Sequence, residues 1–265
     1  MVKGSRLLGT AMIACLALVG GATTAGAAET TAYDSYVALG DSYSSGVGAG
    51  AYGDSGNCKR SANAFPQLYA DEAGVGDFTF VACLGARTGD VVSQTDSLSA
   101  DTDLVTVSVG GNDAGFTDVM ISCTTSSDQG CINRVEEAKS YADDTLPGLL
   151  DDVYAAISAN SPNAEVYVLG YPRFYEIGGS CNAGLSDTKR EAINSGADKL
   201  AEVTEARASA AGFTFVDVRP NFTGHEICSA DWWLNSVTWP VDESYHPNVA
   251  GQASGYLPAL QSAMG

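Results

Sequence analysis

Short apolar, β-branched runs recur along the chain and predict a series of β-strands. They cover residues 35–39, 78–82, 104–109, 165–169 and 213–218, and Gly, Pro or Asp flanks most of them. Apolar runs of this length between turn-forming residues are typical of strands buried on both faces. The pattern therefore predicts a sheet in the interior of the protein.

Longer stretches with helical spacing lie between these runs. They cover residues 64–73, 90–98, 132–159 and 188–211, and a last one follows His246 and Pro247. Pro147 should break or kink the third helix, because proline lacks the backbone donor and clashes with the preceding turn. Asp187 is a candidate N-cap for the fourth helix.

Strands that alternate with helices predict an α/β fold, in which helices cover both faces of a parallel sheet. Sites in such sheets form at the carboxyl ends of the strands. No repeat or interdomain linker interrupts the pattern, which predicts one domain over residues 28–265. The polar stretch 122–130 predicts a loop, closed by a bridge between Cys123 and Cys131.

The N-terminus predicts a secretory signal peptide over residues 1–27. Two basic residues precede an apolar stretch over residues 7–21, and small residues lead to a cleavage point near Ala27 or Ala28. The stretch is shorter than the roughly 20 residues that span a bilayer. We therefore expect a secreted, extracellular protein without stable membrane insertion. A lipoprotein anchor at Cys15 is a weaker alternative, because the residues before it fit that signal poorly.

The charge balance excludes several classes of partner. Lys and Arg total 13 against 32 Asp and Glu, a formal net charge of −19 at pH 7. Such a chain repels nucleic acids and anionic bilayers, so we expect no nucleic-acid partner, at most brief contact with a lipid interface, and a monomer. The two histidines, His225 and His246, are too few for a His-rich metal site.

Six cysteines remain after removal of the predicted signal peptide, and an even number in an exported chain favours three disulfides. Sequential pairing is the simplest arrangement, because each bridge then closes a separate loop. The cysteines alone leave other connectivities open. The sequential pairs are Cys58–Cys83, Cys123–Cys131 and Cys181–Cys228.

Polar or small residues follow three predicted strands and precede the last helix. Ser42 lies in a Gly-Asp-Ser sequence after the first strand, Gly85 follows the second, Asn112 follows the third, and His246 precedes the last helix. A serine acts as a nucleophile when a histidine takes its proton and N–H groups receive the oxyanion. Each residue alone also fits an ordinary turn, cap or surface position, and the chain lacks a G-x-S-x-G sequence.

Taken together and in this order, the four blocks resemble the SGNH (GDSL) hydrolase family over essentially the whole mature chain. Within that family they are similar to secreted actinomycete lipases and phospholipases A1. The resemblance implies a three-layer α/β/α sandwich with a flavodoxin-like, five-stranded parallel sheet. It also supports the sequential disulfide pairing, which those enzymes share.

The resemblance implies a role for each of the four residues. Ser42 would be the nucleophile, and His246 the general base and later the general acid. The oxyanion hole would consist of the N–H groups of Ser42 and Gly85 and the side-chain amide of Asn112. No metal or cofactor is implied.

The chain departs from the family where an Asp is expected three residues before the histidine, because Glu243 stands there. The Glu243 carboxylate would replace that Asp, or the backbone carbonyl of Glu243 or Ser244 would orient the ring, or Asp242 would reach it. We favour the carbonyl, which gives a Ser–His dyad.

Two hypotheses about function follow. The first is a serine ester hydrolase that acts on lipid esters, including phospholipids at the A1 position, with acetylated carbohydrate as the alternative substrate. Trp232 and Trp233, adjacent in a loop before His246, are candidate acyl-chain contacts. The second is a non-catalytic exported binding module, which would not need the four residues together.

Overall fold

The computed structural model describes residues 1–2, 4, 33–181 and 184–265. Cys15 and the cleavage point of the predicted signal peptide lie outside the described residues. Residues from Ala32 onward form one unit, to which all of the following refers.

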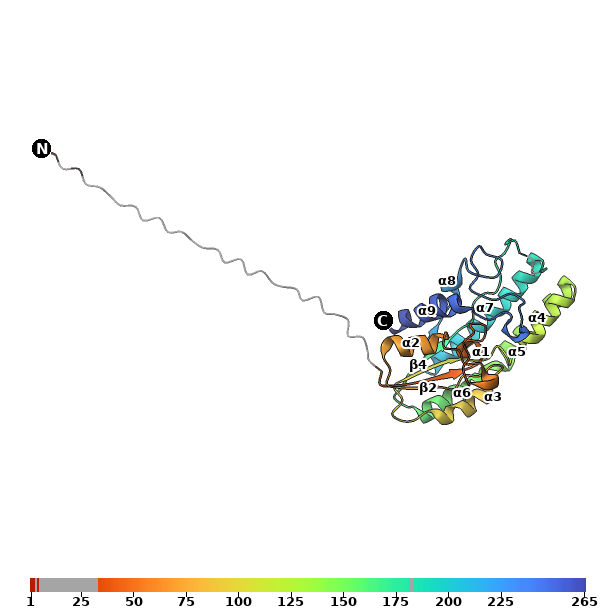
Figure 1. The fold of residues 1–265 in the computed structure, drawn as a ribbon, viewed down its shortest axis with the longest axis horizontal. Coiled ribbons are helices and arrows are strands. Elements are labelled where there is room, and N and C mark those ends of the chain that lie inside the picture. Colours follow the sequence, from red (N-terminus) through yellow and green to blue (C-terminus); the bar gives the residue numbers. More distant parts are fainter. Residues whose placement is uncertain (3, 5–32, 182–183) are drawn as a thin grey trace. The chain divides into compact units, whose positions relative to one another are not determined.

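Five parallel strands form the sheet at the centre of this unit (Figure 1). The strands are β1 (Ser35–Gly40), β2 (Asp77–Phe80), β3 (Leu104–Ser108), β4 (Glu165–Leu169) and β5 (Thr214–Val216). Their order is β2-β1-β3-β4-β5, so the chain changes its winding direction between β1 and β3. Gly40 pairs with Ser108 at the carboxyl ends of these two strands. Open α/β sheets form their crevice at such a switch point.

The two faces of the sheet carry separate hydrophobic clusters because strand residues alternate between the faces. Tyr36 and Ala38 of β1 belong to one cluster, together with residues of α2, α4, α5, α7 and α9. Val37 and Leu39 belong to the other, together with residues of α3, α6 and α7. Helices therefore cover both faces, which confirms the predicted three-layer α/β/α arrangement.

The predicted helical stretches are present with three differences, and the two short helices over residues 42–45 and 219–222 were not predicted. They are α1 (Ser42–Ser45), α2 (Phe65–Ala73), α3 (Thr88–Gln94), α4 (Phe116–Thr125), α5 (Asp128–Asp144), α6 (Leu146–Asn160), α7 (Asp187–Ala210), α8 (Arg219–Phe222) and α9 (Leu257–Met264). Single helical turns lie at Gly56–Cys58, Thr95–Ser97 and Val241–Glu243, and a π-helical turn at Gly251–Tyr256 precedes α9.

The first difference concerns the predicted third helix, which is two helices. As expected, the break lies beside Pro147: α5 ends at Asp144, and Pro147 stands in the first turn of α6. The second difference is the cap of α7. Ser186, not Asp187, is the N-cap, because the Ser186 side chain accepts a hydrogen bond from the Lys189 N–H. Asp187 is the first residue of the helix.

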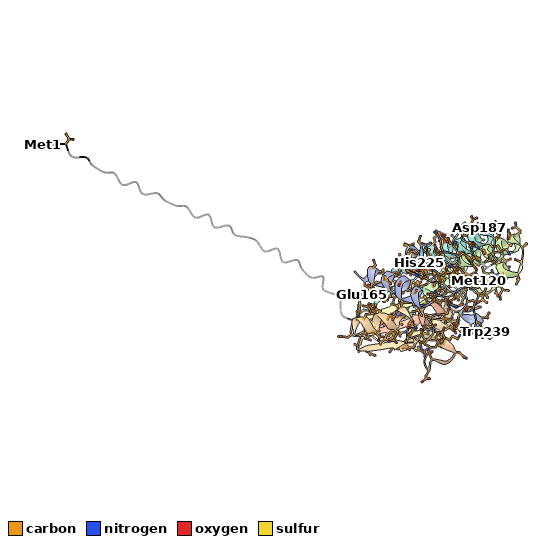
Figure 2. All side chains as sticks on the ribbon, turned by 45° about the horizontal axis from the view of Figure 1, so that its top comes forward. Met1, Met120, Glu165, Asp187, His225 and Trp239 are labelled. Carbon is orange, nitrogen blue, oxygen red and sulfur yellow. A yellow bond between two sulfur atoms is a disulfide. The ribbon has the colours of Figure 1, made fainter. Side chains whose placement is uncertain are left out.

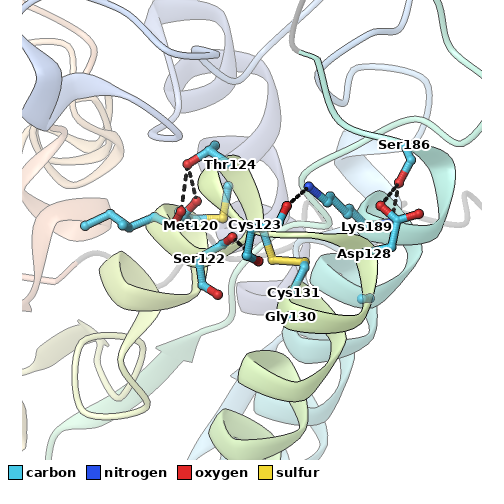
Figure 3. Close-up of a disulfide and its surroundings, with 12 residues drawn as sticks. Met120, Ser122, Cys123, Thr124, Asp128, Gly130, Cys131, Ser186 and Lys189 are labelled. Carbon is cyan, nitrogen blue, oxygen red and sulfur yellow. Dashed lines mark hydrogen bonds between the residues drawn. A yellow bond between two sulfur atoms is a disulfide. The ribbon is translucent and has the colours of Figure 1, made fainter.

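The third difference is the stretch 122–130, for which the loop prediction is wrong. Its first residues complete α4 and its last residues begin α5. The Ser126 hydroxyl donates to the Ser122 carbonyl, and Ser127 caps α5 by accepting from the Gly130 N–H. The disulfide Cys123–Cys131 therefore joins two helices at a tight corner (Figure 3). The serine side chains here cap the ends of two helices and do not indicate a loop.

Among the described residues, no helix is both long enough and apolar enough to cross a membrane.

Candidate active site

Two residues that are far apart in the chain meet at the carboxyl end of the sheet. Ser42 Oγ and His246 Nε2 lie 2.7 Å apart, a hydrogen bond across 204 positions of sequence. Both residues are buried, with 4% and 8% of their surface exposed. The sequence predicted this pair from two separate motifs, and the fold brings the two side chains into direct contact.

The turn that carries Ser42 depends on close approach between β1 and β3. Gly40 has a φ of +124°, and a Cβ there would lie 2.6 Å from the Ser108 carbonyl oxygen. Only glycine fits this backbone at this distance. Asp41 then caps α1 by accepting from the Tyr43 N–H, so Ser42 becomes the first residue of that short helix.

The loop that carries His246 is fastened to the same turn. Tyr43, the residue after Ser42, donates its hydroxyl to the Tyr245 carbonyl at 2.7 Å. Gly48 permits the contact, because a Cβ there would lie 3.0 Å from the His246 Cβ and 2.7 Å from Asn235 Nδ2. Tyr245 has a φ of +64°, an uncommon value for a bulky side chain. Tyr43, which follows Ser42, is thus joined to Tyr245, which precedes His246.

Burial lowers the pKa of His246 to about 4. The ring is therefore neutral at pH 7, and Nε2 can accept the proton of Ser42 Oγ. Nδ1 is buried and makes no hydrogen bond of normal geometry with a described residue. The Ser244 backbone partly opposes this effect of burial on the His246 pKa.

The two carboxylates before His246 form ion pairs with Lys59. Lys59 Nζ lies 2.8 Å from Asp242 Oδ2 and 3.5 Å from Glu243 Oε1. Neither side chain makes a hydrogen bond to the His246 ring among the contacts of the described residues. The contacts therefore give no support to a Glu243 or Asp242 side chain as the group that orients the ring, and the backbone alternative stays a prediction.

Lys59 also links this loop to the segment that carries Gly85. Cys58, its neighbour, forms a disulfide with Cys83. The Leu84 N–H donates to the Cys58 carbonyl at 3.1 Å. One bridge and one ion pair thus connect the Gly85 segment with the His246 loop.

The N–H donors that the sequence singled out lie beside the same crevice. Gly85, with a φ of +78°, has open space where a Cβ would stand. In the described structure, the N–H groups of Ser42 and Gly85 donate to no protein acceptor. Asn112 Nδ2 donates to the Ala86 carbonyl at 2.9 Å, which holds the amide beside the Gly85 turn. An amide nitrogen carries two hydrogens, so one remains for another acceptor.

A buried carboxylate next to Ser42 connects the Ser42 turn with the segment that carries Asn112. Asp41 accepts from the Tyr171 hydroxyl and, at 2.7 Å, from Ser108 Oγ. The Tyr171 hydroxyl in turn accepts from the Gly111 N–H at 3.3 Å. Burial raises the Asp41 pKa to about 6, against these hydrogen bonds. Asp41 and Tyr171 thus join the Ser42 turn to the residue before Asn112.

An apolar cavity opens beside Ser42 and Asn112, between the segments that follow β1, β3 and β4 and helices α4, α5 and α7. Val119, Val135, Ala138, Ile193 and Leu200 are among its lining residues. Its walls are chiefly apolar next to the serine hydroxyl, which is the character of a site for a hydrocarbon chain.

Trp232 and Trp233 do not line that cavity, which differs from the prediction. Trp232 packs against the core and donates Nε1–H to the Ser229 carbonyl at 2.7 Å. Trp233 stacks on His225, with ring centroids 3.5 Å apart. Their adjacency suggested contacts with an acyl chain, but Trp232 rests on the core and Trp233 stacks on His225. His225 therefore serves as a packing surface for Trp233.

In the part of the chain that the structure describes, no three His, Cys, Asp or Glu side chains are grouped so that they could hold a metal ion. The crevice offers a hydroxyl, an imidazole and N–H donors instead. That set can form and stabilise an acyl intermediate.

Comparison with known proteins points to the part of the chain that carries the candidate site. The profile of the GDSL-like Lipase/Acylhydrolase family matches residues 38–253, a range that contains all four candidate residues. Lipase 1 of Streptomyces coelicolor is 56% identical over 259 residues, covering 97% of this chain and 96% of that protein.

Two solved structures are also similar. The crystal structure of phospholipase A1 from Streptomyces albidoflavus has a TM-score of 0.85 at 52% identity, covering 88% of this chain and all (100%) of that one. The extracellular lipase of Streptomyces rimosus has a TM-score of 0.85 at 53% identity, covering 86% and 99%.

Proposed function

The chain belongs to the GDSL-like lipase/acylhydrolase family, and from this premise we propose that it is a secreted hydrolase of lipid esters that acts through an acyl-enzyme on Ser42. It is an ester hydrolase by this relationship. The observation that carries the mechanism is the 2.7 Å hydrogen bond between Ser42 Oγ and His246 Nε2.

In the first half-reaction, Ser42 Oγ bonds to the ester carbonyl carbon while its proton passes to His246 Nε2. The carbonyl oxygen becomes an oxyanion, which the N–H groups of Ser42, Gly85 and Asn112 stabilise. The bond to the alcohol then breaks, and the alcohol oxygen takes the proton from His246. In the second half-reaction, a water gives its proton to His246 and attacks the acyl carbon, and Ser42 recovers a proton as the acid leaves.

Lipid esters are the substrate class that the cavity favours. Its lining beside Ser42 is almost wholly apolar and extends between three helices, whereas an acetyl group would leave most of that surface uncovered. Phospholipase A1 activity is part of the proposal, since a relative of 52% identity bears that name. Export agrees with the three disulfides and with the extracellular relative.

The test is hydrolysis of p-nitrophenyl esters of increasing chain length, of phosphatidylcholine and of acetylated xylan, with EDTA present. We expect Ser42→Ala and His246→Ala each to lower kcat/KM by about 10³-fold or more. Ser93→Ala, an exposed serine on α3, is the matched control and should keep full activity. An active Ser42→Ala protein would overturn the mechanism. Activity on acetylated xylan alone would show that the substrates are acetylated carbohydrates and not lipid esters.

A further inference from the structure

The loop that precedes His246 is closed at its base by hydrogen bonds. We call residues 236–243 the Trp239 loop. The Asn235 N–H donates to the His246 carbonyl at 2.9 Å, and the Tyr245 N–H donates to the Asn235 carbonyl at 3.0 Å. The Thr238 N–H donates to Ser244 Oγ at 3.0 Å. The loop therefore leaves and rejoins the protein directly beside the hydrogen-bonded pair.

The tip of this loop presents apolar side chains to solvent. Val237 is 62% exposed, Trp239 88% and Val241 64%. Figure 2 shows Trp239 at the periphery of the unit, well apart from His225, on which Trp233 stacks. Solvent-exposed apolar groups that adjoin one another mark contact surfaces, and tryptophan is the side chain best suited to the boundary between water and lipid.

The charge around the tip differs from that of the whole chain. The protein carries −19 overall, but the two carboxylates that follow the tip, Asp242 and Glu243, share the ammonium group of Lys59. The tip is therefore apolar, and Lys59 partly neutralises the two carboxylates beside it. This combination suits a surface without net charge and disfavours an anionic one.

We propose that the Trp239 loop docks the protein on aggregated lipid without net charge, with Trp239 inserted among the lipid chains. The inference rests on the proposed hydrolysis of lipid esters. The loop that bears the anchor ends three residues before His246, the base of the reaction, so docking holds the crevice near the lipid. Trp239 does not line the cavity, so its loss spares the chemistry.

Binding is tested in the Ser42→Ala background, where no lipid is consumed, by flotation with phosphatidylcholine vesicles. We expect Trp239→Ser to weaken binding about tenfold or more, and Trp239→Phe to retain most of it. Ile177→Ser, which removes an apolar side chain 45% exposed on another segment, is the matched control and should bind normally. Vesicles of phosphatidylglycerol should bind less than those of phosphatidylcholine.

Activity is tested with Ser42 in place. Trp239→Ser should hydrolyse monomeric p-nitrophenyl butyrate within about twofold of the unsubstituted rate and vesicular phosphatidylcholine at least about tenfold more slowly. Unchanged vesicle binding in Trp239→Ser, stronger binding to phosphatidylglycerol, or a dimer that this change dissociates would overturn the proposal. If the unsubstituted protein hydrolyses neither ester, the proposed function itself fails. Hydrolysis of the butyrate without vesicle binding would refute only the docking surface.

Discussion

At the scale of single residues, the environment of His246 determines the pH range in which it can take a proton. Burial lowers its pKa to about 4, so the ring is protonated only below that pH. Asp41, in the same crevice, has a pKa raised to about 6 by burial. The two groups therefore change charge in separate ranges of pH.

We expect kcat/KM for a soluble ester to be constant between about pH 5 and 8 and to fall as the pH drops through about 4, because protonated His246 cannot act as a base. A stopped assay with p-nitrophenyl butyrate across this range measures the profile. An acid limb near pH 6 that disappears in Asp41→Asn would instead assign the limb to Asp41.

The position of Glu243 allows a second prediction. Its carboxylate lies beside Lys59, at 3.5 Å, and not against the imidazole. Glu243→Ala should therefore lower kcat/KM less than about fivefold, the size of a partly exposed ion pair. His246→Ala should lower it by about 10³-fold or more. Equal losses in the two variants would show that the carboxylate orients the ring.

Sequence reasoning reached the residues whose chemistry is distinctive and missed those whose role comes from distant contacts. Ser42 and His246 stand out as a serine and a rare histidine next to strand or helix boundaries. Tyr43 and Tyr171 could not be found this way. Their partners lie 202 and 130 positions away, and nothing marks them among the 12 tyrosines.

At the scale of elements, the strands could be predicted because both faces of the sheet are covered. A strand such as β3 is then a short buried run, largely apolar and β-branched, that turn residues follow. The corner between α4 and α5 could not be predicted. Its serines and threonines resemble a loop in composition, and only their bonds to carbonyls one turn earlier show that they end one helix and begin the next.

The contact between α5 and α7 offers a test of the acyl cavity. A Cβ at Gly196 would lie 3.5 Å from Val135 Cγ1, an ordinary contact, and both residues line the cavity. Gly196→Leu should therefore fold and partly fill the cavity. We expect it to slow hydrolysis of long-chain esters about tenfold or more and to leave butyrate esters within about threefold.

The matched control for this change is Gly148→Leu, which adds the same side chain to an exposed helical glycine with no neighbour within 4 Å. Its chain-length profile should equal that of the unsubstituted protein. If Gly196→Leu gave that same profile, the acyl chain would have to occupy another site.

At the scale of the whole molecule, the three disulfides have different neighbours. Cys58–Cys83 closes 25 residues beside the crevice, and Cys123–Cys131 closes 8 at the helix corner. A bridge of this kind contributes about 2–4 kcal/mol, and each 1 kcal/mol changes Tm by about 2–4 °C in a domain of this size.

We expect Cys58→Ser/Cys83→Ser and Cys123→Ser/Cys131→Ser both to lower Tm by roughly 4–16 °C. Only the first pair should also lower kcat/KM for butyrate esters, by at least about fivefold at 20 °C, because it releases the Gly85 segment from Lys59. Calorimetry and initial rates separate the two effects. Equal rates in both double variants would refute a geometric role for the first bridge.

The link from Cys58 through Lys59 to the acidic pair has a consequence for the maturation of the enzyme. In a newly made chain whose thiols are still reduced, only non-covalent contacts would align the Gly85 segment with the loop that carries His246, among them the ion pairs of Lys59 and the hydrogen bond from the Leu84 N–H to the Cys58 carbonyl. Under the proposed export, full catalytic competence would then be acquired only when the thiols of Cys58 and Cys83 are oxidised after the protein has left the cell.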